Sequence, residues 1–152
     1  MAGTTNRGKK LILEYCFNRT TRPTNFYVAL CTSATTPTDD TNVLGDLTQI
    51  ATGNGYSDGG YQLSPGSTDF DASGEDDTSN YGYIQLKDVT WTASGGPIPA
   101  SGNGARWAVI TDDNATVANR QVITFWDLSS DRSVSSGQSL TLQNCEIRIT
   151  ES

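Results

Sequence analysis

The chain has 152 residues, of which 35% are hydrophobic and 18% charged, and its formal net charge at pH 7 is -7. This length is typical of one domain, and no apolar run reaches the roughly 18 residues that a membrane-spanning helix requires, so we expect no membrane partner. The chain contains no histidine, which excludes Ser-His-Asp and Cys-His catalytic arrangements and removes the commonest general base.

Positive charge is concentrated at the amino-terminal end. Residues 1–22 contain five bases and one acid, Glu14, whereas the rest of the chain contains the other five bases and sixteen acids. An acidic body argues against nucleic acid as a partner, because duplex binding requires a continuous basic face. The basic end either meets an acidic partner or is simply solvated.

A helix is predicted over residues 5–18. After a basic first turn its residues are apolar nearly all round, as in a helix that is buried or docked against another chain. Lys9 and Lys10 oppose the helix dipole, which favours a role in a contact, with ordinary solvated lysines as the equal alternative. Pro23 ends the element, because the residue before a proline disfavours helical conformation.

A strand is predicted at residues 25–31, where apolar side chains alternate on two faces. The composition then changes to Thr, Ser, Asp and Gly. Short strands are predicted at 44–52 and 60–63, followed by a long acidic loop at 64–80. Asp69 opens a stretch that superficially follows a calcium loop, but Asn80 stands where such a loop needs its closing Glu, so a solvated loop is favoured over a metal site.

Strand patterns resume at Tyr81. The apolar residues then change from even to odd positions at Lys87-Asp88, and this change of parity predicts a β-bulge or bend. Strands follow at 105–112 and 122–128, and the final apolar run changes parity again at Gln143-Asn144. Bends of this kind let a strand pass from one sheet to another. The pattern predicts a mainly β protein: an antiparallel β-sandwich of jelly-roll type (residues 25–152) led by an N-terminal α-helix and arm (residues 1–24).

The side chains that often carry chemistry favour structural roles. Cys16, Cys31 and Cys145 form an odd, widely spaced set, for which small buried thiols are favoured over a disulfide framework. The three tryptophans lie in strong strands, which favours core packing over a sugar-binding platform. With seventeen acids, some carboxylate pair reaches glycosidase spacing by chance, so such a pair carries almost no weight. We expect no enzyme activity, no cofactor and no metal.

Several segments carry a family resemblance: the amphipathic helix at 9–17, the Pro-led Tyr-Val-Ala-Leu-Cys-Thr strand at 23–32, Gly55-Tyr56, the aromatic strands at 105–112 and 122–128, and the alternating-Leu ending at 134–142. In these segments the chain resembles small virion proteins of tailed bacteriophages, of the capsid decoration (cement) and tail-fibre-like type. The likeness is weakest at 59–80, which is longer and more acidic.

The resemblance implies a virion structural protein that decorates the capsid and stabilises the major capsid protein lattice, as a dimeric or trimeric homo-oligomer. The residues expected to contact the capsid or a sister subunit are Arg7, Lys9, Lys10, Leu11, Tyr15, Arg19 and Arg22. The alternative is a tail-fibre or adsorption protein that binds host-surface carbohydrate. Its expected glycan contacts are Tyr56, Tyr61, Tyr81 and Tyr83.

Overall fold

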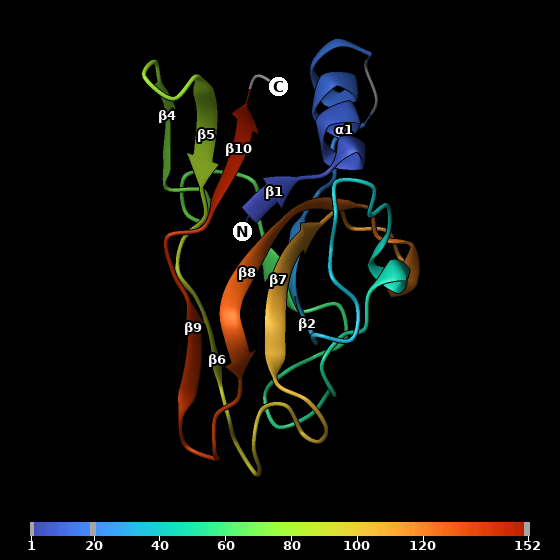
Figure 1. Ribbon diagram of the computed structural model, residues 1–152, viewed down its shortest axis with the longest axis vertical. Coiled ribbons are helices and arrows are strands. Elements are labelled where there is room, and N and C mark those ends of the chain that lie inside the picture. Colours follow the sequence, from blue (N-terminus) through green and yellow to red (C-terminus); the bar gives the residue numbers. More distant parts are fainter. Residues whose placement is uncertain (1, 19–20, 151–152) are drawn as a thin grey trace.

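The protein is mainly β, with antiparallel sheets and one N-terminal helix, in a computed structural model that describes residues 2–18 and 21–150 (Figure 1). The strand orders are β1-β8-β7-β2-β3, β10-β5-β4 and β6-β9, and within the described residues none of these sheets closes into a barrel. The elements are β1 (Ala2–Thr4), α1 (Asn6–Phe17), β2 (Phe26–Cys31), η1 (Leu44–Asp46), β3 (Tyr61–Leu63), β4 (Ala72–Asp76), β5 (Tyr81–Gln85), β6 (Val89–Thr92), β7 (Ala105–Thr111), η2 (Val117–Asn119), β8 (Val122–Arg132), β9 (Ser139–Leu142) and β10 (Glu146–Thr150).

The two smaller sheets form one bent layer. β5 leads into β6, and β9 into β10, and these two runs stay paired on both sides of the bend, from Glu146 opposite Gln85 to Val89 opposite Leu142. Within the bend, the backbone N–H of Leu86 donates to the carbonyl of Cys145 at 2.8 Å. The breaks predicted at Lys87-Asp88 and Gln143-Asn144 are confirmed. Because both runs bend together, neither crosses to the five-stranded sheet.

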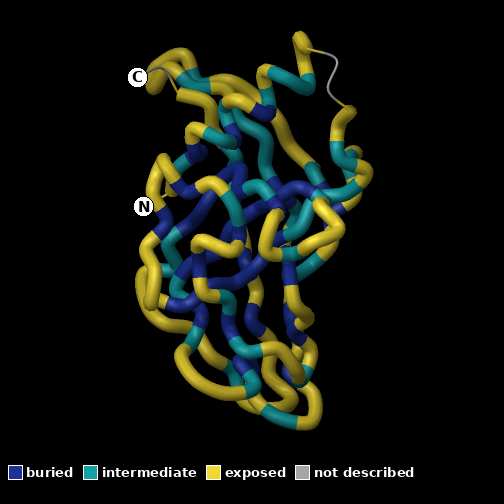
Figure 2. The backbone as a smooth tube through the Cα atoms, turned by 90° about the vertical axis from the view of Figure 1, so that its right-hand side faces the viewer, coloured by how far each residue is buried: buried dark blue, intermediate teal, exposed yellow. Residues whose placement is uncertain are grey.

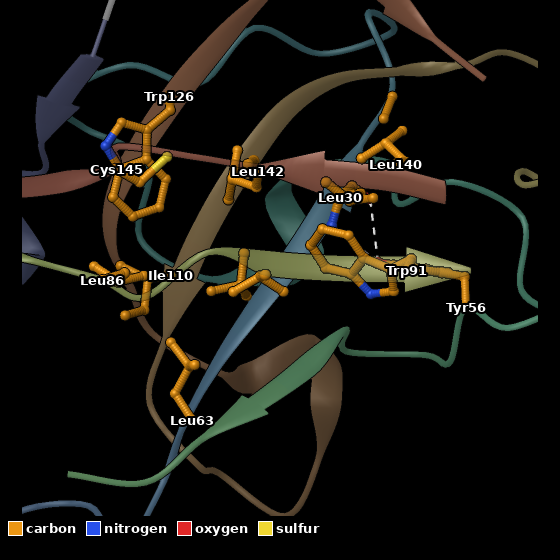
Figure 3. Close-up of a cluster of buried hydrophobic side chains, with 14 of the residues drawn as sticks. Leu30, Tyr56, Leu63, Leu86, Trp91, Ile110, Trp126, Leu140, Leu142 and Cys145 are labelled. Carbon is orange, nitrogen blue, oxygen red and sulfur yellow. Dashed lines mark hydrogen bonds between the residues drawn. The ribbon is translucent and has the colours of Figure 1, made fainter. Parts of the chain in front are cut away.

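The main core lies between this bent layer and the five-stranded sheet. Figure 3 shows Leu30 and Ile110 of the large sheet close to Leu86, Trp91 and Leu142 of the bent layer. The change of parity explains why apolar residues on both sides of the bend are buried. The bend turns both halves of each run toward the five-stranded sheet. The predicted burial of the tryptophans is confirmed, with Trp91, Trp107 and Trp126 exposed by 3%, 6% and 6%.

A second core covers the other face of the large sheet. Ala29 and Cys31 of β2 and Trp107 and Val109 of β7 pack there against Leu44 and its neighbours. β2 is therefore buried on both faces from Val28 onward. The buried backbone gathers in the middle of the molecule, and exposed segments lie at both ends (Figure 2).

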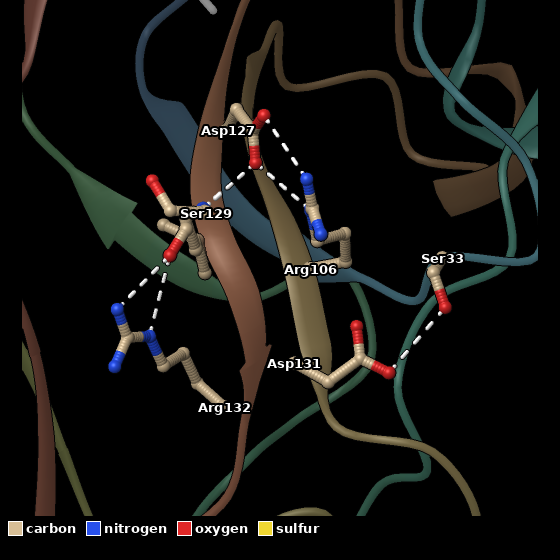
Figure 4. A network of polar contacts seen from close by, with 7 residues as sticks. Ser33, Arg106, Asp127, Ser129, Asp131 and Arg132 are labelled. Atoms are coloured by element: carbon tan, nitrogen blue, oxygen red, sulfur yellow. Dashed lines mark hydrogen bonds and ion pairs between the residues drawn. The ribbon is translucent and has the colours of Figure 1, made fainter.

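Polar contacts hold the edge of this second core. Arg106 binds Asp127 through two hydrogen bonds of 2.9 and 3.2 Å, and the backbone N–H of Ser129 donates to the same carboxylate at 2.7 Å (Figure 4). The Arg106 guanidinium and this N–H hold the pKa of Asp127 below its usual value. The Arg106 guanidinium also lies 5.6 Å from the Trp107 ring centre, so it links the sheet surface to the core.

Two segments between β2 and β5 differ from the sequence prediction. The strand predicted at 44–52 is wrong: η1 lies there, stabilised by the Asp46 carboxylate, which accepts the backbone N–H groups of Asn42 and Val43. The loop predicted at 64–80 contains the edge strand β4, which pairs with β5. Its polar sequence gives no strand signal, because an exposed edge strand needs no alternation of apolar residues.

Other expectations are settled at single residues. Asp69 is not solvated: it is buried, paired with Lys87, and accepts the backbone N–H of Ser64.

The three cysteines are free thiols, and Cys31 and Cys145 are buried as expected. Cys16 is exposed, which corrects the expectation for that residue. It lies on α1, where only one side of the helix packs on the body.

α1 confirms the helix predicted at 5–18. The Thr5 hydroxyl caps it by accepting the backbone N–H of Gly8 at 2.9 Å. Gly8 and Leu11 are its buried residues, so the helix is not buried all round. Preceding it, β1 pairs with β8 and adds an edge strand that the sequence did not reveal. Within the described residues, no helix has the length and apolar character to cross a membrane.

Candidate functional site

An apolar groove of about 580 Å³ lies between α1, the β10-β5-β4 sheet and the ends of β2, β7 and β8. Figure 1 shows α1 and this sheet standing at the same end of the molecule. Ile84 pairs with Ile147 and Gly82 with Ile149, and all four line the groove, so one face of the sheet is turned toward it. The helix side of the groove is formed by Ile12, Tyr15 and Cys16.

The helix also has an uncovered apolar side. Leu13 and Phe17 are 59% and 82% exposed. They lie one helical turn apart, on the side away from Gly8, Leu11 and Tyr15. Among the described residues, the exposed large apolar side chains are these two and Ile149 of β10, at 42%. All three lie on the elements that flank the groove.

The basic residues expected to make contacts occupy different places on this end. Arg7 and Lys9 are half-buried, while Lys10 forms an ion pair of 3.0 Å with Glu14 on the same helix. Arg22 is exposed and lines the groove. The predicted contact at Arg19 lies outside the described residues.

Leu11 corrects the list of expected contacts. It is only 4% exposed and belongs to the protein's own core, so it is not available to a capsid or a sister subunit. Leu13, two residues further along, lies on the opposite side of the helix and is exposed. The sequence missed this because the helix is apolar on nearly every side, and its pattern does not say which side packs inward.

Tyr15 lies at the helix side of the groove and keeps its proton. Burial, together with the carboxylates of Asp112, Asp113 and Glu14, raises the pKa of Tyr15 to about 12. At neutral pH its hydroxyl is therefore a neutral hydrogen-bond donor beside an apolar surface. Such a group orients a bound partner without adding charge.

The four tyrosines of the carbohydrate alternative fall into two groups. Tyr56 is 2% exposed and its hydroxyl is bonded to the backbone of Leu30, which excludes it as a sugar-stacking surface and corrects that expectation. Tyr61 is half-buried and packs edge-on against Trp91 at 6.2 Å. Tyr81 and Tyr83 lie side by side on one face of β5, with ring centres 6.0 Å apart.

No family model, curated protein or solved structure matches the chain. The chemistry of the described residues therefore carries the functional argument. Within residues 2–18 and 21–150, no group of three or more His, Cys, Asp or Glu residues is placed to hold a metal ion.

The groove is the feature that sequence reasoning missed. Its two sides come from opposite ends of the chain, the helix at residues 12–16 and β10 at residues 147–149. The alternation of Ile147 and Ile149 was visible and indicated a strand with one apolar face. Nothing in that local pattern indicated that the face lies opposite the N-terminal helix.

Proposed function

We propose that this protein is a bacteriophage virion structural protein that decorates the capsid and stabilises the major capsid protein lattice. The observation that carries the proposal is the pair Leu13 and Phe17, two large apolar side chains one turn apart on an exposed helix face. Such a pair is a typical anchor of a helix that docks into an apolar groove on a partner. The family resemblance of the sequence supports the same assignment.

The arrangement of α1 suits a docking role because the helix is firmly attached to the body. Thr5 donates to the carbonyl of Val122 at 2.6 Å, and Gly8 lies against the backbone of Ile123. A rigidly held helix loses little conformational freedom when it binds, so more of the contact energy contributes to affinity. Arg7 and Lys9, in the first turn of the helix, add attraction to an acidic partner surface.

Cementing then follows from mass action. A protein that binds the assembled lattice and not its separated subunits stabilises the assembly by its binding free energy. Copies that associate with one another bind a repeating lattice with avidity, so modest individual affinities suffice. In this proposal the site of action is the outer surface of the virion.

The test mixes the purified protein with expanded, undecorated shells of the major capsid protein. Sedimentation measures binding, and the midpoint of heat disruption measures stabilisation. We expect the wild-type protein to bind and to raise that midpoint, and Leu13→Ser with Phe17→Ser to reduce binding by at least tenfold. Ser136→Ala, an exposed change in the β8–β9 connection at the far end of the molecule, is the matched control. Absence of wild-type binding would refute the proposal.

The alternative function is adsorption to host-surface carbohydrate, favoured by the paired rings of Tyr81 and Tyr83. The Arg148 guanidinium lies 4.5 Å from the Tyr81 ring centre, so this face combines aromatic surface with hydrogen-bond donors. Glycan-array binding that is lost in Tyr81→Ala with Tyr83→Ala, while shell binding is absent, would favour this function over cementing.

We also propose that the two layers constitute a β-sandwich of jelly-roll type. Two features support this classification. The main core takes side chains from both layers, and the chain changes layer after β3, after β6 and after β8. Repeated crossing between two antiparallel layers is typical of Greek-key and jelly-roll proteins.

A further inference from the structure

The apolar groove beside α1 is deep. Ile110 of β7 and Ile123 of β8 line it, although their side chains are only 0% and 4% exposed and belong to the main core. The floor of the groove therefore reaches the core of the protein. Its volume of about 580 Å³ lies within the range of sites that hold a small organic molecule, and it is more than one side chain of a docked protein would fill.

Both walls of the groove are fixed to the same body. The helix wall is held by the Thr5 hydroxyl, which donates to the carbonyl of Val122 on β8 at 2.6 Å. The sheet wall is held by the Trp126 indole N–H, which donates from β8 to the carbonyl of Glu146 on β10 at 2.9 Å. Because both walls are attached to β8, the groove is formed before any ligand enters, and binding costs little ordering of the chain.

Two side chains with hydrogen-bond donors line one end of this apolar groove. They are Tyr15 and Arg22, and among the residues that the structure describes neither side chain has a hydrogen-bond or ion-pair partner. Asp113 marks this end of the groove. Its carboxylate accepts the backbone N–H groups of Thr24 and Asn25, close to Arg22 in the chain, and it contributes to the raised pKa of Tyr15. The groove therefore has unused donors at one end.

Charges of both signs act at this end, so neither an anion nor a cation is favoured there. Arg22 is positive, whereas the carboxylates of Asp112, Asp113 and Glu14 act on Tyr15. Each of these carboxylates already accepts a hydrogen bond or an ion pair within the chain. A bound ammonium group would be repelled by Arg22, and a bound carboxylate by the three acids. A neutral acceptor meets neither penalty.

We infer that the groove is a binding site for an uncharged amphiphile: a hydrocarbon chain that ends in a neutral oxygen acceptor, as in an acyl ester. The chain lies against the apolar floor and walls, and burial of its surface supplies most of the affinity. The ester carbonyl accepts hydrogen bonds from the Tyr15 hydroxyl and the Arg22 guanidinium, which orient the ligand. This inference goes beyond the proposed function and does not depend on it.

The experiment compares three probes of equal chain length that differ in the charge of the head: methyl decanoate, decanoate and decylammonium. Equilibrium dialysis at pH 7 measures their affinities. We expect methyl decanoate to bind at one site per chain, and at least about tenfold more tightly than either ion. Its binding should also slow the reaction of Cys16 with DTNB in the wild-type protein, because this exposed thiol lines the groove.

Three variants locate the site. Cys16→Trp places a large side chain at the groove and should abolish binding of methyl decanoate. Ser136→Trp, an exposed change in the β8–β9 connection at the far end of the molecule, is the matched control and should leave binding unchanged. Tyr15→Phe removes only the hydroxyl and should weaken binding of the ester by about threefold to tenfold. Thermal unfolding close to that of the wild-type protein shows that the variants are folded.

Four outcomes would overturn the inference. They are no binding of methyl decanoate to the wild-type protein, binding that leaves Cys16 as reactive as before, binding that survives Cys16→Trp, and an ion that binds as tightly as the ester. Shell binding that is lost in Cys16→Trp, with no probe bound by the wild-type protein, would assign the groove to a protein partner. The proposed function fails separately, because it is tested with shells and with Leu13 and Phe17, which do not line the groove.

Discussion

Gly8 of α1 lies so close to Ile123 of β8 that a Cβ atom on Gly8 would overlap the Ile123 carbonyl. The contact allows the helix backbone to approach the edge of the five-stranded sheet, with the Thr5 backbone N–H donating to the same carbonyl at 2.9 Å. The position of α1, and with it the groove and the outward face of Leu13 and Phe17, therefore depends on a glycine.

Gly8→Ala should destabilise the protein even though alanine is the better helix former. The propensity gain is at most about 1 kcal/mol, whereas forcing a methyl group against backbone costs about 1–3 kcal/mol. We expect a net loss of free energy of unfolding, measured by urea denaturation. Gly82→Ala is the control, because a Cβ there meets only ordinary contacts. Equal stability of Gly8→Ala and wild type would show that α1 does not depend on this approach.

Tyr56→Phe should reduce the free energy of unfolding by about 1–3 kcal/mol. The Tyr56 hydroxyl accepts the backbone N–H of Leu30 at 3.0 Å and lies 3.2 Å from the side-chain oxygen of Gln49, its acceptor. Removing the hydroxyl leaves the Leu30 N–H without its partner in the core. Tyr27→Phe removes only an exposed bond to Gln62 and should change stability by no more than about 0.5 kcal/mol. Similar losses in both variants would contradict this account.

Asp69→Asn should destabilise the protein by about 1 kcal/mol at neutral pH. Lys87 and the backbone N–H of Ser64 lower the pKa of Asp69 from its ordinary value. A lowered folded-state pKa contributes stability above the unfolded value of about 3.9, and this contribution is lost as the pH falls through the folded pKa. The difference in free energy of unfolding between the wild type and Asp69→Asn, measured by urea denaturation, should therefore shrink below about pH 4. Asp71→Asn, an exposed change nearby, is the matched control and should change the free energy of unfolding at neutral pH by no more than about 0.5 kcal/mol.

One thiol of the native protein should react rapidly with a disulfide reagent such as DTNB, and three should react after unfolding. Cys16 is exposed, whereas burial raises the pKa of both Cys31 and Cys145 to about 12, with Asp88 adding to the effect at Cys145. Buried, protonated thiols are poor nucleophiles. Cys16→Ser should abolish the fast reaction, and a fast thiol that persists in this variant would show that one of the other two is accessible.

Strong local patterns predicted much of the fold. The alternation in residues 25–31 and the β-branched runs at 105–112 and 122–128 correspond to β2, β7 and β8. The changes of parity near Lys87 and Asn144 predicted the bends. A bend changes which alternate residues face the core, so the spacing of the apolar residues in the sequence changes at the same point. Each of these signals lies within a few neighbouring residues.

The elements that were missed have no such local signal. β4 is polar and exposed, and it is a strand because β5 supplies its hydrogen-bond partners. β1 is three residues long and exists because the edge of β8 was open to pairing. The segment at 44–52 contains apolar residues that pack over the large sheet without forming a strand, and burial alone does not specify backbone conformation.

The amino-acid sequence by itself determined the β-rich class, the N-terminal helix, the bends and the burial of the tryptophans, because these follow from the spacing of side chains along a short stretch of backbone. Only the tertiary structure decided which side of α1 packs inward, that Leu13 and Phe17 face outward, and that an apolar groove separates the helix from β10. The physical reason is distance along the chain: the two sides of the groove lie more than a hundred residues apart, and packing of the whole molecule brings them together.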